Sequence, residues 1–316
     1  MIRSVWTFPG QLTEYVGMGG GLLEGSRAFA ERLEAASDLC GYDLARLCRE
    51  GPEATLRRDD CAALAVVAAG TAAAEELGRS GYAPDGMIGY SLGLYSAAAA
   101  AGAISYESAF SIVLTVAGEG DLLFPPGEMA MGIVTGLRLA TLEEALRGPL
   151  SGGSIAVTNV NSQAQVVIAG RTEDVEGALE TVRPQSIRSE RLPIGRPYHS
   201  RWMAPVARAV ASLVEGLDVS VPRVPLFDHR DGSALATAEA VRERLSGQLT
   251  SRLDWPGSVL RLVGEGASVF VEMPPGTTTT RMIRWIARDA TAFAIDQPAD
   301  RERFLAAALG RRPGGA

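Results

Sequence analysis

The chain has 316 residues, 47% hydrophobic and 21% charged, a composition typical of a globular protein with a substantial buried core. Its 30 basic residues are all arginine, which excludes lysine chemistry, and its net charge of -7 argues against nucleic acid or an anionic membrane as the main partner. Cys40, Cys48 and Cys61 have neither a CxxC spacing nor nearby histidines, so we expect free thiols in a reducing cytoplasm and no metal site.

Strands and helices alternate through the first 120 residues or so. A strand is predicted over Ser4–Phe8, and a second at Met87-Ile88. The predicted helices of this part cover residues 26–40, 61–79, 95–103 and 106–118. Buried strands joined by helices are typical of a parallel sheet covered on both faces. No segment reads as long enough to span a membrane, and the start of the chain leads into a strand instead of a signal peptide.

The pattern changes after residue 125. The predicted elements there are a strand over 129–134, a helix over 142–147, strands over 154–160 and 165–169, a helix over 172–182 and a strand over 187–192. This β-α-β-β-α-β order matches a ferredoxin-like unit. We therefore predict an α/β protein whose core, residues 1–125 and 193–316, carries a small subdomain over residues 126–192.

After the insertion, the chain returns to the pattern of the core. Helices are predicted over 205–215, 237–248 and 280–288, and an apolar strand over 268–273. The polar, glycine-rich tail over 311–316 is expected to fray.

The pentapeptide Gly89-Tyr90-Ser91-Leu92-Gly93 has the G-x-S-x-G pattern of a nucleophile elbow. It stands between an apolar strand and a helix of small residues, which is the context that this turn requires. The glycines permit a sharp turn that lifts the serine oxygen clear of the backbone, at the positive end of the following helix. A chance match is the alternative, but the context favours Ser91 as a catalytic nucleophile.

A serine nucleophile needs a base, and the chain has only two histidines. His199 lies where the predicted subdomain returns to the core, so we expect it to face the cleft between the two parts and to take the serine proton. His229 lies in a polar turn and is interpreted as a surface residue. The Leu92 amide is one expected oxyanion donor, and the loop over 8–11 should supply the second. Asp254 is a candidate for orienting the imidazole, through its carbonyl or its carboxylate.

Five segments together resemble the malonyl-CoA:acyl carrier protein transacylase family, which includes the acyltransferase units of polyketide synthases. They are residues 8–11 with 17–19, 89–93 with 101–105, 159–162 with 165–170, 197–200 with 203, and 271–276. The resemblance implies an α/β-hydrolase-like core with a ferredoxin-like subdomain and no bound cofactor. It implies a ping-pong transfer of an acyl group from a thioester to the phosphopantetheine thiol of a carrier protein. By position it makes Ser91 the nucleophile, His199 the base, and the amides of Gln11 and Leu92 the oxyanion hole.

The family resemblance also identifies the acyl site. Members that use malonyl units carry an arginine in the helix after the elbow, which holds the free carboxylate by two hydrogen bonds. Here Val116, or its neighbour Ala117, stands at that position, and a carboxylate buried there without a partner would cost several kcal/mol. We therefore expect a neutral or amine-bearing acyl group, with Arg196 as an alternative source of the missing charge. Tyr90, in place of the usual histidine, and the bulky Tyr198 are the other predicted acyl-site residues.

A carrier protein is acidic, so an acidic enzyme needs a local basic patch to dock it. Arg281, Arg284 and Arg288 recur at i, i+3 and i+7 of one predicted helix, and Arg201 is a further candidate. A solvated helix face is the alternative. We expect a cytoplasmic, monomeric, stand-alone acyltransferase of a polyketide-type pathway. A malonyl transacylase of fatty-acid synthesis, an editing hydrolase and an inactive docking module remain alternatives.

Overall fold

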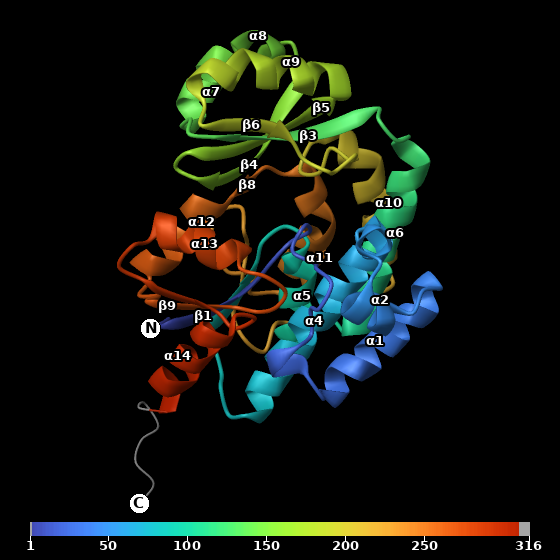
Figure 1. Cartoon of the computed structure of the whole chain (residues 1–316), viewed down its shortest axis with the longest axis vertical. Helices are drawn as coiled ribbons and strands as arrows, with labels where there is room; N and C mark the ends of the chain where they lie inside the picture. Colours follow the sequence, from blue (N-terminus) through green and yellow to red (C-terminus); the bar gives the residue numbers. More distant parts are fainter. Residues whose placement is uncertain (1, 310–316) are drawn as a thin grey trace, which may run out of the picture.

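Two five-stranded sheets lie one above the other in the computed structural model, which describes residues 2–309 (Figure 1). The lower sheet has the strand order β10-β9-β1-β2-β7, and all of its pairs are parallel. Its strands are β1 (Ser4–Phe8), β2 (Gly86–Gly89), β7 (Leu226–Phe227), β9 (Val269–Glu272) and β10 (Thr291–Ala294). Because helices cover this sheet, β1 and β2 are almost wholly buried, which explains their apolar sequences.

Helices pack on both faces of the parallel sheet: α12 and α13 cover one face, and α1, α4, α5 and α6 lie on the other (Figure 1), where Phe304 of α14 also packs. They are α1 (Arg27–Cys40), α2 (Leu44–Glu50), α3 (Glu53–Leu56), α4 (Asp59–Arg79), α5 (Gly93–Ala100), α6 (Tyr106–Leu123), α10 (Ala204–Glu215), α11 (Ala238–Gly247), α12 (Trp255–Gly264), α13 (Thr278–Ile286) and α14 (Pro298–Leu309).

Helix α4 lies at the centre of the helical layer. Its alanine-rich sequence presents small side chains, so α1, α5 and α6 all pack against it. By length and hydropathy this helix is able to cross a membrane, contrary to the prediction that no segment is long enough. However, 83% of that apolar window is buried inside the protein. The buried core helix of a globular protein passes the same test, so α4 is weak support for a membrane span.

The upper sheet has the order β6-β3-β5-β4-β8 and is antiparallel except for the pair β4–β8. Its elements are β3 (Met129–Thr135), α7 (Leu139–Ala145), α8 (Arg147–Ser151), β4 (Ile155–Ser162), β5 (Gln165–Arg171), α9 (Thr172–Val182), β6 (Arg188–Arg191) and β8 (Leu253–Asp254). The predicted α/β class and the ferredoxin-like unit are confirmed. Strand β8 joins this sheet from outside residues 126–192, and the domain boundaries remain a prediction.

The two faces of the upper sheet have different neighbours. Val134, Val166 and Ile168 turn toward α7 and α9 and form a small separate core with them. Ile133 and Val167, one residue along β3 and β5, turn the other way and line a cleft above the core sheet. This alternation places a wall of the cleft on the inserted unit, opposite the carboxyl ends of the core strands.

The predicted elements differ from the structure mainly at their ends. Helix α6 continues to Leu123, and α13 ends at Ile286, so Arg288 lies beyond the helix on which it was placed. The predicted frayed tail over 311–316 lies outside the described residues. Helices and strands that the sequence patterns missed are α2, α3, α8, α12, α14, β7, β8 and β10.

Candidate active site

Ser91 occupies the turn between β2 and α5, as the pentapeptide pattern predicts. Its backbone φ is 55°, in the left-handed region that non-glycine residues rarely adopt. A Cβ added at Gly89 would lie 2.1 Å from backbone atoms of Gly93, and one at Gly93 would lie 2.1 Å from the Phe8 carbonyl oxygen. Both glycines are therefore required for the close backbone approach of this turn, which is a strained feature of a kind that clusters at functional sites.

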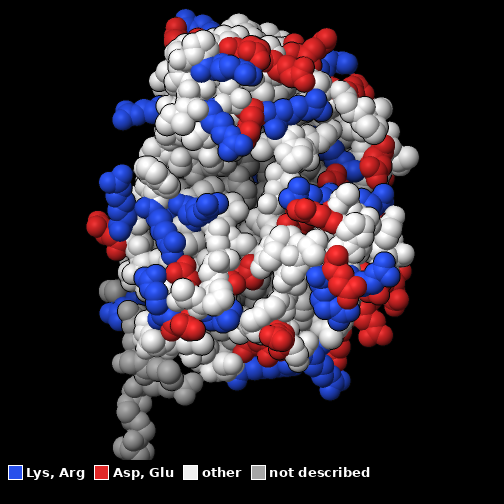
Figure 2. All heavy atoms as spheres, in the orientation of Figure 1, with Lys and Arg blue, Asp and Glu red and all other residues white. Residues whose placement is uncertain are grey.

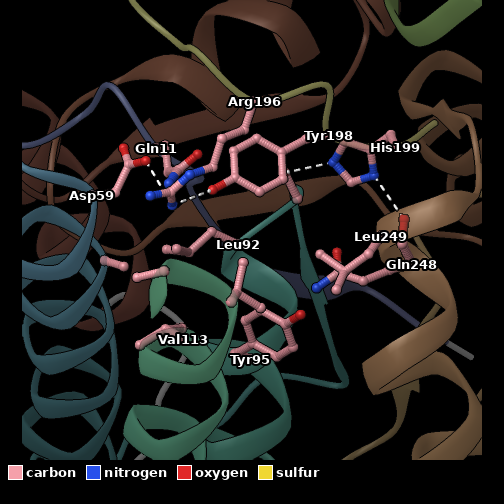
Figure 3. Close-up of a pocket in the computed structure, with 14 residues that line it drawn as sticks. Gln11, Asp59, Leu92, Tyr95, Val113, Arg196, Tyr198, His199, Gln248 and Leu249 are labelled. Atoms are coloured by element: carbon pink, nitrogen blue, oxygen red, sulfur yellow. Dashed lines mark hydrogen bonds and ion pairs between the residues drawn. The ribbon is translucent and has the colours of Figure 1, made fainter. Parts of the chain in front are cut away.

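His199 lies beside Ser91, with its Nε2 atom 2.7 Å from the serine Oγ. On the other side of the ring, Nδ1 donates a hydrogen bond of 2.9 Å to the backbone carbonyl of Gln248 (Figure 3). The carbonyl can only accept, so it fixes the proton on Nδ1 and leaves the Nε2 lone pair for the serine hydroxyl. His199 also has a positive φ, 59°, so both residues of the pair are held in strained conformations.

Burial sets the protonation state of His199. The side chain has lost nearly all contact with solvent, and this desolvation lowers its pKa from 6.5 to about 4. The ring is therefore neutral at physiological pH and ready to accept a proton.

Asp254 does not orient His199, and that prediction is wrong. Its carboxylate accepts a hydrogen bond from the Gly257 amide and caps α12, while its carbonyl accepts one from the Ser258 hydroxyl. The Gln248 carbonyl takes the predicted role. The pattern Asp254-Trp-Pro-Gly is a typical helix start, so the cap was readable in the sequence.

His229 is not a surface residue, as its polar neighbours suggested. Only 1% of it is exposed, and its Nδ1 donates a hydrogen bond of 2.9 Å to the Gly89 carbonyl, two residues before Ser91. Its ring meets the His199 ring edge-on, with the centroids 5.9 Å apart. Burial lowers the pKa of His229 to about 3. Sequence reasoning missed this residue because a two-residue strand, β7, carries it under the elbow.

Acid should destabilise the fold through these two histidines. Their pKa values are depressed from 6.5 to about 4 and about 3, so below pH 6.5 the unfolded chain binds protons that the folded protein does not. The free energy of unfolding should therefore fall as the pH drops below 6.5, by up to about 1.4 kcal/mol per pH unit for each ring. Urea unfolding between pH 7 and pH 5, above the range of most carboxylates, measures the slope. His229→Asn should halve it, and a flat profile in the natural protein would contradict the argument.

The backbone amides of Gln11 and Leu92 are candidates for an oxyanion hole. Within residues 2–309, the amides of Gln11 and Leu92 donate to no other protein group, although both residues line the cavity at Ser91. Leu92 directly precedes α5, so its amide lies at the positive end of that helix. Gly10 lets the two loops approach, because a Cβ there would lie 2.9 Å from the Tyr90 carbonyl oxygen.

A narrow cavity of about 30 Å³ extends from Ser91 into the helical layer. Its walls are mostly apolar, and they include Val116, a predicted acyl-site residue, and its neighbour Ala117. The remaining lining residues are Gln11, Asp59, Ala63, Leu92, Tyr95, Val113, Arg196, Tyr198, His199, Gln248 and Leu249. The space is small, since a cavity of roughly 10–15 Å³ on this measure holds one water molecule.

Arg196 lies at the polar end of this cavity, and its guanidinium group is already paired. One terminal nitrogen lies 2.7 Å from the Asp59 carboxylate (Figure 3), and the other donates a bond of 2.6 Å to Asp121. The first also contacts the Tyr198 hydroxyl, at 3.3 Å. Gly120 leaves room for the group, because a Cβ there would lie 2.5 Å from the Arg196 Nε atom. The local charge of the three ionised groups is one negative unit.

Tyr90 lies outside the narrow cavity, at the wall of the larger cleft. Its hydroxyl donates a bond of 2.6 Å to Asn161 and accepts one of 3.0 Å from Asn159, both on β4. The cleft measures about 540 Å³ and lies between the core and the upper sheet. Because both spaces are bounded by Gln11, Ser91, Tyr198 and His199, they meet at the serine.

The arginines predicted to dock a carrier protein do not form one uniform helical face. Arg281 lines the cleft, whereas Arg284 is paired with Asp300 at 2.7 Å, and Arg288 lies 5.9 Å from the centre of the Trp285 ring, which is exposed. Arg201, which is not on α13, stacks on the Trp202 ring. Figure 2 nevertheless shows basic side chains gathered at the left of the molecule, over the region where Figure 1 places α12 and α13.

The described part of the chain, residues 2–309, contains no cluster of metal-ligating side chains. Its three cysteines are free thiols.

The site has a serine in a nucleophile elbow, hydrogen-bonded to a neutral histidine. This pair, on an α/β core with a ferredoxin-like unit, is typical of serine enzymes that transfer acyl groups. Residues 5–296 match the family described as the acyl transferase domain, so the chain belongs to that family and is an acyltransferase. The family needs no bound cofactor, since acyl-CoA and acyl carrier protein are its substrates.

Curated relatives and solved structures agree with this assignment. The chain is 30% identical to the malonyl CoA-acyl carrier protein transacylase of Escherichia coli K12 over 311 residues, which cover 98% of this chain and 99% of the relative. It is 28% identical to the polyketide biosynthesis malonyl CoA-acyl carrier protein transacylase PksC of Bacillus subtilis, covering 91% and 98%. A malonyl-transacylase solved in complex with a type II polyketide synthase acyl-carrier protein superposes with a TM-score of 0.90 at 30% identity, covering 98% of this chain and 100% of that one.

Proposed function

We propose that this protein transfers an acyl group from a thioester, through an acyl-Ser91 intermediate, to the phosphopantetheine thiol of an acyl carrier protein in polyketide-type biosynthesis. The observation that carries the proposal is the 2.7 Å contact of Ser91 Oγ with His199 Nε2, at the point where the narrow cavity and the large cleft meet. The cavity would hold the acyl group, and the cleft would hold the thioester arm.

Neutral His199 acts as the base of the first half-reaction. It takes the serine proton as Oγ attacks the thioester carbon, and the amides of Gln11 and Leu92 stabilise the oxyanion that forms. When the carbon–sulfur bond breaks, His199 returns the proton to the leaving thiolate. The second half-reaction reverses these steps, with the carrier thiol as nucleophile. The Gln248 carbonyl stabilises the imidazolium that forms in each step, because it accepts from Nδ1.

The cleft suits a pantetheine arm in size and in polarity. Its volume of about 540 Å³ lies within the range of small-molecule sites, and Asn159 and Asn161 offer amide groups in its wall. The buried Asn159 Oδ1 has no protein partner among the described residues, so the Asn159 amide would have to turn for a ligand to reach it. At the rim, Arg281 and the exposed Trp285 are suited to an acidic carrier protein, with Arg201, Arg284 and Arg288 farther out.

The acyl group is proposed to be neutral or to carry an amine. Val116 and Ala117 offer no charge to a carboxylate, and the Arg196 guanidinium is occupied by Asp59 and Asp121. A malonyl carboxylate would have to displace one of these partners or remain unpaired, which is costly in a buried site. A neutral or positive substrate end needs no such displacement, and Asp59 in the cavity wall offers a positive end a carboxylate.

Malonyl transfer is the second candidate, because the relatives named above are malonyl transacylases. An editing thioester hydrolase is a third, since water can replace the carrier thiol at the same site. We further propose that the protein acts as a cytoplasmic monomer, with no nucleic-acid or membrane partner, in keeping with its acidic composition.

Mass spectrometry of the intact protein distinguishes these candidates. The protein is incubated with acetyl-, malonyl- and methylmalonyl-CoA and with aminoacyl carrier-protein thioesters, and the mass added to the enzyme is followed in time. Acetyl or aminoacyl loading at least about tenfold faster than malonyl loading is expected. Fast malonyl loading would refute the neutral-acyl proposal. An acyl-enzyme that decays to free acid at the same rate with and without acceptor carrier protein would indicate the hydrolase.

A further inference from the structure

A buried polar layer lies behind the serine and the histidine. It contains Asp228, His229 and Arg244, whose exposed fractions are 1%, 1% and 7%. None of these side chains has a role in the transfer steps above. Polar groups this deeply buried are costly, so their arrangement needs a reason.

His229 extends the pairing of β2 with β7. The two strands pair at Met87 with Leu226 and at Ile88 with Phe227. At the next residue of β2, the His229 side chain replaces the backbone partner, since its Nδ1 donates a hydrogen bond of 2.9 Å to the Gly89 carbonyl. The last residue of β2 is thereby held from below, immediately before the strained turn that carries the nucleophile.

The turn that carries His229 is itself anchored. The Asp228 carboxylate accepts a bond of 2.9 Å from the Arg230 amide and lies 3.6 Å from the Arg244 guanidinium. Arg244 belongs to α11, the helix that leads directly into Gln248, whose carbonyl orients His199. One short turn therefore contacts both the strand of the serine and the helix that positions the histidine.

We propose that His229 is a positioning residue, which fixes the Gly89 carbonyl and packs against the His199 ring so that Ser91 and His199 stay within hydrogen-bond distance. The proposal rests on Ser91 and His199 as the reacting pair. It does not depend on which acyl group the enzyme carries.

A role for His229 as a second base does not fit its surroundings. Its Nδ1 is used by Gly89, and its Nε2 is buried without a partner among the described residues. Arg244 and Arg230 disfavour a positive charge on His229, as does His199 once it is protonated, while the neighbouring Asp228 carboxylate is paired with both arginines, at 3.6 Å and 3.1 Å. Burial is the largest cause that lowers the pKa of His229, to about 3. A neutral His229 also avoids repelling His199 when that ring becomes an imidazolium.

The test measures the reactivity of Ser91 directly, with a small alkyl fluorophosphonate that forms a covalent adduct seen by intact-mass spectrometry. His229→Leu keeps a similar volume but removes the donor, and should slow labelling by about 10- to 100-fold in protein that remains folded. His229→Asn places an amide near the position of Nδ1 and should restore the rate to within about threefold. Ser233→Ala, on the same turn, is the matched control and should label at the natural rate.

The pH dependence separates positioning from proton transfer. Labelling should be flat between pH 6 and pH 8 in the natural protein and in both His229 variants, because His199 remains the base. A new titration in His229→Leu would overturn the proposal, as would an unchanged rate. If that variant does not fold, His229→Gln replaces it, since its longer amide overshoots the Gly89 carbonyl. Equal rates for His229→Gln and His229→Asn would then refute positioning. No labelling of the natural protein would refute the Ser91–His199 pair itself.

Discussion

A protein with Ser91→Ala should form no acyl-enzyme with any thioester, and its transfer rate should fall by at least about 10⁴-fold. Ser91 Oγ is the group that contacts His199 Nε2 at the elbow, and the alanine leaves no oxygen at that position to attack the thioester. The variant should lose its transfer rate but keep its thermal stability, because the turn depends on Gly89 and Gly93 and not on the serine hydroxyl.

Helix α5, which follows Ser91, offers a matched control for this variant. Ser96 is also a buried serine, and its hydroxyl has no hydrogen-bond partner among the described residues. Ser96→Ala should therefore load and transfer at the natural rate. Intact-mass spectrometry of both variants, with melting temperatures measured in parallel, gives the comparison. An acyl adduct on the Ser91→Ala protein would show that another residue is the nucleophile.

The fold could largely be predicted from the sequence, and so could the contact between Ser91 and His199, because their signals are local. The elbow is a contiguous pattern flanked by a strand and a helix, and a chain with two histidines leaves little choice of base. The ferredoxin-like unit was predicted from the order of its elements alone, since βαββαβ admits few compact arrangements.

The surroundings of Ser91 and His199 could not be predicted from the sequence, because they depend on distant parts of the chain. The acceptor for His199 is a backbone carbonyl, that of Gln248, and a carbonyl has no residue type to signal it. His229 reaches Gly89 from a strand of two residues, too short to show a period. Arg196 meets Asp59 across a separation in sequence that no local pattern spans.

Replacing Val116 should change which acyl group the enzyme prefers. Val116→Arg places a guanidinium in the wall of the narrow cavity, where a malonyl carboxylate can pair with it by two hydrogen bonds. We expect malonyl-CoA loading to rise by about 10- to 100-fold relative to acetyl-CoA, the range that corresponds to a charged hydrogen bond. The ratio of the two loading rates, measured on Ser91 by intact mass, is the readout.

The competing partner for the new arginine is Asp59, which lines the same cavity. If Asp59 captures the guanidinium, the single variant will gain little, whereas the double variant Val116→Arg with Asp59→Asn should show the full gain. Val116→Leu is the matched control, since it changes shape without charge and should leave the malonyl preference unchanged. A double variant that folds but gains no malonyl loading would mean that residue 116 does not face the acyl group. The apolar wall of α6 would then not be what selects the substrate, and Arg196 would remain as the positively charged group among the described residues that line the cavity.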